Sequence, residues 1–192
     1  MVASASRPGG SVQTTTTLTI WVYDNAMGAA AGEIRLKALQ QRGPVRVVEA
    51  VTVTWMPRAE VPHVGHMTRL GAAAATKGSV LGALVGSLFM APVVGAAVGA
   101  GVGGLVHKLR DTGIDHAFLD EVISRLTPGT SALVVLSHDL DLDAVRAFVE
   151  RGIARGDVSM MHVRLRDDAP EALRRLFAST RTAGEKRVGL SG

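Results

Sequence analysis

The sequence predicts an α+β fold of the ferredoxin-like, split βαβ type, interrupted by a long glycine-rich apolar insertion. Four short segments rich in β-branched residues alternate with helical segments in the order β-α-β, then β-α-β. The insertion lies between the second and third of these strands. Its glycines recur every four residues, a spacing typical of helices that pack closely.

The first βαβ unit begins with a strand over residues 17–23, TLTIWVY, which ends at Asp24-Asn25. Either of these two residues can cap the helix expected over 26–41. Apolar residues stand at helical spacing in that segment, namely Ala30, Ala31, Ile34, Ala38 and Leu39, and Gly43-Pro44 stops it. A second strand, RVVEAVTVTWM, covers residues 46–56 and ends before Pro57.

The second βαβ unit follows the insertion. Its expected elements are a helix over 115–126, a strand over 131–137, a helix over 141–151 closed by Gly152, a strand over 157–165 and a short helix over 170–178. In the predicted fold, two helices cover one face of an antiparallel four-stranded sheet. We expect a single domain over 17–179, with the insertion at 70–109 and disordered tails at 1–16 and 180–192.

Composition narrows the partners and the compartment. The net charge is +4, but the basic residues are dispersed and no aromatic residues accompany them, so nucleic acid is not an expected partner. The chain has no cysteine, which rules out disulfides and thiolate metal sites and fits a reducing compartment. The segment Met1 to Thr17 has no apolar stretch, so we expect no secretory signal peptide in it.

The insertion contains two consecutive glycine zippers. Residues four apart share one helix face, so each zipper offers a smooth stripe on which another helix can approach closely. Six glycines would cost an isolated, exposed helix about 1 kcal/mol each, and close packing is the natural compensation. The residues expected to pack helices or subunits together are Ala74, Gly78, Gly82 and Gly86 in the first half and Ala91, Gly95, Gly99 and Gly103 in the second.

The insertion is also long enough to enter a membrane. A single span would separate the second and third strands, so we expect a hairpin with arms 70–91 and 92–109 and its turn at Pro92. Basic residues at its base would keep both ends cytoplasmic, namely Arg69, Lys77, Lys108 and Arg110. No aromatic belt is present, which leaves a soluble assembly with the zippers packed between subunits as the alternative.

No catalytic, cofactor or metal site is expected. Residues 99–104, GAGVGG, follow no strand, so they are not a dinucleotide loop. His63 and His66 are expected in an exposed loop, although metal binding by this pair stays open. The run Asp139, Asp141, Asp143 lacks the glycine and glutamate of a calcium loop and fits helix capping. Whether a small-molecule ligand exists also stays open.

The pieces LTIWVYDN, GSVLGALVGSLFMAPVVGAAVGAGVGGLV, DTGIDHAFLDEV and LTPGTSALVVL occur in an order that resembles the bacterial domain of unknown function 1269 family. The resemblance covers about residues 18–177. Proteins of that family are often described as membrane or stress-related proteins. The resemblance implies a bacterial protein without assigned catalysis, and it supplies no site residues.

The leading functional hypothesis is a noncatalytic, membrane-associated protein that associates with itself through the glycine-zipper hairpin. Its partners would be other copies of the chain and membrane lipid. It would lie on the cytoplasmic side of the bacterial inner membrane, or in the cytoplasm. The alternative is a soluble oligomeric module that binds a ligand or has a regulatory role.

Overall fold

The computed structural model describes residues 15–43, 45–66, 79–89, 107 and 109–177. Its centre is a five-stranded sheet in which every neighbouring pair is antiparallel and the order is β3-β2-β4-β1-β5. The strands are β1 (Thr16–Tyr23), β2 (Arg46–Thr54), β3 (His63–His66), β4 (Ser131–His138) and β5 (Val158–Arg164). The chain is therefore of the α+β class, as the alternation of elements predicts.

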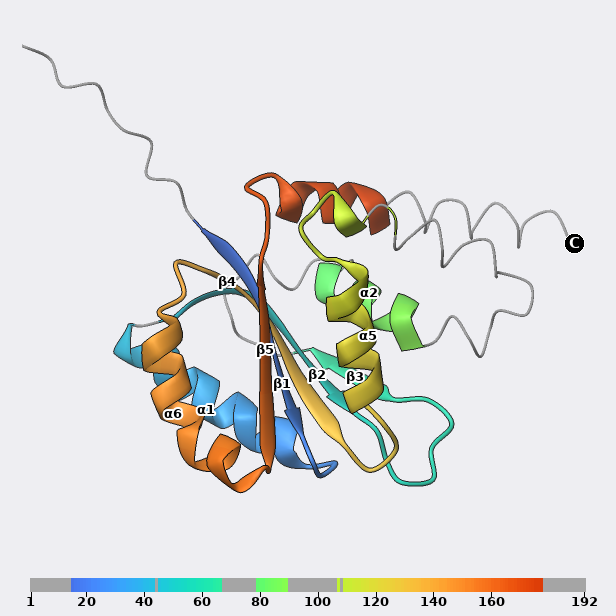
Figure 1. Ribbon diagram of the computed structural model, residues 1–192, viewed down its shortest axis with the longest axis vertical. Coiled ribbons are helices and arrows are strands. Elements are labelled where there is room, and N and C mark those ends of the chain that lie inside the picture. The colour runs from blue at the N-terminus through green and yellow to red at the C-terminus, as the bar shows by residue number, and fades with distance from the viewer. Residues whose placement is uncertain (1–14, 44, 67–78, 90–106, 108, 178–192) are drawn as a thin grey trace, which may run out of the picture.

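The sheet is covered on both faces, not on one as expected (Figure 1). Helices α1 (Gly28–Arg42) and α6 (Leu142–Arg155) lie on one face, and α2 (Val80–Phe89) and α5 (His116–Arg125) lie on the other. Residues 169–177 are also helical and place Leu173 in the same core as α2 and α5. Because β1 is central, its alternate side chains enter two different cores and all eight residues are buried.

Strand β3 is a second correction, because its residues were expected in a loop. It pairs with β2, with Val64 opposite Val53, and forms one edge of the sheet. Gly65 permits the close pairing: a Cβ at this position would lie 2.6 Å from the Thr52 hydroxyl oxygen. At the other edge lies β5, whose neighbour among the described strands is β1.

Helix α1 packs on the sheet through a face that its apolar spacing did not indicate. Its buried residues are Gly28, Ala29, Gly32, Leu36 and Leu39, whereas Ile34 is 71% exposed. Gly28 and Gly32 allow the helix backbone to rest on Tyr23, since a Cβ at either glycine would overlap that side chain. Burial raises the pKa of Tyr23 to about 12, with a smaller opposing influence from Arg35.

Helix α6 is longer than expected because Gly152 does not end it. The helix continues to Arg155, and Gly156, with a φ of 81°, follows it. Gly152 is instead a point of close approach: a Cβ there would lie 3.0 Å from Val158 Cγ2 on β5. At the start of α6 the capping prediction holds, because the Asp141 carboxylate accepts a hydrogen bond of 3.1 Å from the Asp143 amide.

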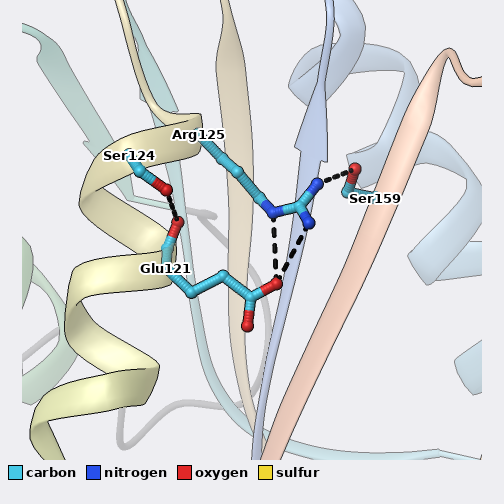
Figure 2. A network of polar contacts seen from close by, with 4 residues as sticks. All are labelled: Glu121, Ser124, Arg125 and Ser159. Atoms are coloured by element: carbon cyan, nitrogen blue, oxygen red, sulfur yellow. Dashed lines mark hydrogen bonds and ion pairs between the residues drawn. The ribbon is translucent and has the colours of Figure 1, made fainter.

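Helix α5 begins as predicted, with Asp115 as its N-cap accepting a 2.8 Å hydrogen bond from the Phe118 amide. Figure 2 shows how the end of α5 is tied to the sheet edge: Arg125 pairs with Glu121 and donates to the Ser159 hydroxyl on β5. The two charged side chains are nearly half exposed, so this pair contributes at most about 1 kcal/mol.

Candidate functional site

The described part of the glycine-rich insertion is α2, and its large side chains face the sheet. Val80, Leu81, Leu84, Val85 and Phe89 are buried in one core with β1, β2, β4 and α5. Phe89 also meets Trp55 edge to face, with ring centroids 5.9 Å apart. What α2 leaves uncovered on its outer side is therefore mostly its small residues.

A carboxylate from the sheet holds the start of α2. Glu49 on β2 accepts hydrogen bonds from the Ser79 hydroxyl, from the Val80 amide at 3.2 Å and from the Leu81 amide at 3.1 Å. The Ser79 oxygen in turn accepts from the Gly82 amide at 2.8 Å. Three otherwise unpaired amides of the first helical turn are thus satisfied, with a negative charge at the positive end of the helix dipole.

A β-bulge brings Glu49 to this position. Val47 lies opposite Ser137 and Glu49 lies opposite Leu136, so Val48 is an extra residue in β2. A bulge of this kind lets two adjacent side chains share one face of a sheet. Val48 packs against the core on the α2 side, and Glu49 reaches α2 on the same side.

We call the hydrogen bonds from the start of α2 to Glu49 the Glu49 clamp. Beside this clamp, β3 and α2 form an open groove of about 310 Å³. Its lining residues are Pro62, His63, Val64, His66, Ser79, Gly82, Ala83 and Gly86. Gly82 is the tight point, because a Cβ there would lie 2.7 Å from His66 Cε1. Gly86, one turn further on, has no atom within 4 Å of the position that a Cβ would take. The groove is thus closed near Ser79 and open near Gly86.

The structure places three of the predicted site residues. Gly82 and Gly86 line the groove on one helix face, as their spacing predicts, and Arg110 is exposed just before α5. The other predicted residues lie outside the described ranges: Arg69, Ala74, Lys77, Gly78, Ala91, Pro92, Gly95, Gly99, Gly103 and Lys108. Glu49, by contrast, was not expected. The only indication of its role in the sequence is that an acidic residue stands in an otherwise apolar and threonine-rich strand.

His63 and His66 line the groove from β3. Residues three apart on a strand point to opposite faces, so this spacing does not aim both imidazoles at one ion. In the ranges that the structure describes, no group of three or more His, Cys, Asp or Glu side chains is arranged to hold a metal. The groove offers one serine hydroxyl, already bonded to Glu49, and the His66 imidazole beside Gly82.

Over the ranges with a described conformation, no helix combines the length and the apolar character needed to cross a membrane. Helix α2 has ten described residues, or about 15 Å of helix, against about 30 Å of hydrocarbon.

The family model described as "Protein of unknown function (DUF1269)" matches residues 75–178 of the chain. The matched region includes residues 75–109 of the insertion, α5, β4, α6 and β5, but not LTIWVYDN or Glu49. Neither a curated protein nor a solved structure matches the chain significantly. Because the family model covers more than half of the sequence, the chain belongs to the DUF1269 family.

Proposed function

We propose that this chain is a noncatalytic protein that associates with itself through its glycine-rich segment, at the cytoplasmic side of the bacterial inner membrane. The observation that carries the proposal is the outer surface of α2. Gly82, Ala83 and Gly86 line an open groove, and the space beside Gly86 is free of other described atoms. A surface of small residues permits close backbone contact with another helix.

The groove beside Gly82 and Gly86 belongs to the described half of the first zipper, and another helix fits it better than lipid. Moving α2 into a bilayer would keep its own side chains in an apolar environment, but it would expose to water the apolar side chains of β1, β2, β4 and α5 that α2 covers. Exposure of that surface costs about 25 cal/mol per Å². We therefore propose that α2 stays on the sheet, and that any lipid contact is made by the segment that follows Phe89.

The finer fold assignment is part of the same proposal. Without β3, the strand order is β2-β4-β1-β5, with helices connecting β1 to β2 and β4 to β5. That order supports a ferredoxin-like core in which β3 is an added edge strand. The glycine segment would then be an insertion that leaves this core after β3 and returns before α5. We retain Pro92 as the proposed turn of the hairpin.

The decisive variant is Gly86→Leu. Substitution of Gly82 would disturb His66 inside the monomer, whereas a side chain at Gly86 meets no described atom. We expect Gly86→Leu to lower the oligomer mass measured by light scattering while the circular dichroism spectrum stays unchanged. Gly86→Ala is the matched control, because alanine keeps the surface small and should preserve the mass. An unchanged mass for Gly86→Leu would refute packing through this surface.

Membrane association is tested separately by fractionation of cells that produce the full chain. We expect the protein in the membrane fraction, and its release by detergent. Complete recovery from the soluble fraction without detergent would instead favour the second candidate, a soluble oligomeric module with a regulatory or ligand-binding role. The attachment of α2 to the sheet is the observation that keeps this second candidate in view.

A further inference from the structure

Helix α1 has an apolar outer face in addition to its buried one. With about 100° of rotation per residue, the residues within about 60° of the Ile34 direction, opposite those that pack on the sheet, are mostly apolar: Met27, Ala30, Ala31, Ile34 and Ala38, with Gln41 among them and Lys37 at the margin. Met27 is 68% exposed and Ile34 is 71% exposed. A contiguous apolar surface that is left exposed often marks a contact with another protein. Among the described residues, nothing covers this outer face, which we call the α1 crest.

We propose that the α1 crest packs against the α1 crest of a second copy of this chain, with the two helices antiparallel. The proposal does not depend on the glycine groove, which lies on the opposite side of the sheet (Figure 1). It adds a second, independent contact surface to the protein.

The sizes of the crest residues are self-complementary in the antiparallel direction. With the two-fold axis between Ala31 and Ile34, Ile34 of each copy faces Ala31 of the other. In the same register Met27 faces Ala38. Each large side chain therefore meets an alanine, which lets it enter the space beside the opposing backbone, as close helix packing requires.

The charges are self-complementary in the same direction. Asp24, just before α1, and Arg42, at its end, are both exposed. Antiparallel packing in this register brings Asp24 of one copy within one residue, about 1.5 Å along the axis, of Arg42 of the other, at both ends of the contact. The opposed helix dipoles add to this preference. A parallel pair would instead place Asp24 beside Asp24 and Arg42 beside Arg42.

The test uses sedimentation of the full chain over a range of concentrations. We expect Ile34→Glu to raise the dissociation constant of the crest contact at least about tenfold, because it buries a charge at the centre of an apolar interface. The matched control is Ile123→Glu on α5, where the isoleucine is 42% exposed and should not matter. Both measurements are made with Gly86→Leu present, so that groove contacts do not contribute.

Charge exchange tests the direction of packing without changing the crest. Asp24→Arg and Arg42→Asp should each weaken self-association, because each places like charges together. A mixture of the two variants should form heterodimers that neither forms alone, since every end contact then joins an arginine to an aspartate. The single variants report the direction, because a parallel pair already places like charges together in the parent chain and neither variant alone would weaken it further. These exposed substitutions also keep the test valid if Ile34→Glu fails to fold.

Three results would overturn the proposal. The first is an Ile34→Glu protein with the sedimentation behaviour of the parent chain. The second is a mixture of charge variants that stays unassociated. The third is an Ile34→Glu protein with unchanged mass but lost binding to vesicles of anionic phospholipid, which would assign the crest to lipid. A dimer that persists in the Gly86→Leu protein would show that the crest contact does not depend on the groove. The crest proposal and the proposed function can therefore fail separately.

Discussion

The clamp between Glu49 and α2 gives the most direct test of how the glycine-rich segment is attached to the sheet. Replacing Glu49 with alanine removes the acceptor of three hydrogen bonds, from Ser79, Val80 and Leu81. Loss of an N-cap alone costs about 0.5–2 kcal/mol. Each hydrogen bond to a charged group contributes about 1.5–3 kcal/mol when water cannot replace it. The site is only partly buried, so we expect a total loss of about 2–4 kcal/mol.

The assay is equilibrium unfolding of the full chain in urea, together with hydrogen exchange of the Val80 and Leu81 amides. We expect Glu49→Ala to lower the urea midpoint and to speed exchange at both amides. Glu49→Gln keeps one acceptor oxygen and should lose about half as much. The control is Glu33→Ala, which removes only the exposed ion pair with Lys37 and should cost less than about 1 kcal/mol. A Glu49→Ala protein within about 0.5 kcal/mol of the parent would refute the clamp.

Further substitutions test the packing of Tyr23 and α1 and the N-cap of α5. The pKa of Tyr23 is about 12 in the folded protein, against a reference value of 10.0. The stabilisation from its buried neutral form is therefore complete below pH 10 and is lost as the pH rises through 12. Across that range the free energy of unfolding should fall by on the order of 2–3 kcal/mol relative to Tyr23→Phe. Gly32→Ala should destabilise the protein by about 1–3 kcal/mol, because the added Cβ would overlap the Tyr23 side chain. Gly86→Ala, where a Cβ meets no described atom, should be neutral or stabilise by up to about 1 kcal/mol. Equal effects of the two variants in thermal unfolding would contradict this contrast. Asp115→Ala should lose about 1 kcal/mol through the amide of Phe118, and an unchanged midpoint would argue against the cap.

The four long strands could be predicted to within two residues at each end, because β-branched runs bounded by Gly, Pro and Asp are a local signal. Strand β3 could not, since HVGH is too short to show a period and its pairing depends on Gly65 fitting under Thr52. The side of α1 that packs was also hidden. Two glycines on that side make it look weakly apolar, although they are what allows contact with Tyr23.

The expectation that helices cover only one face of the sheet was wrong for a related reason. The sequence predicts that the insertion containing α2 enters lipid or packs between subunits, whereas Leu81, Leu84 and Val85 complete the core on the second face of the sheet. The glycine period correctly predicted that Gly82 and Gly86 share a face. It could not reveal Glu49, because that contact joins residues 30 to 32 positions apart through a bulge.

The strand order has a consequence for synthesis of the chain. Strands β1 and β2 are not neighbours, because β4 lies between them. The closest pair in the β1–β4 ladder, Tyr23 and Ser131, is 131 − 23 = 108 residues apart. The closest β2–β4 pair, Thr54 and Ser131, is 131 − 54 = 77 residues apart. At about 5–20 residues per second, β1 would wait roughly 5–20 seconds and β2 roughly 4–15 seconds before their shared partner emerges from the ribosome. Chaperone demand during translation should therefore be concentrated on the N-terminal third of the chain.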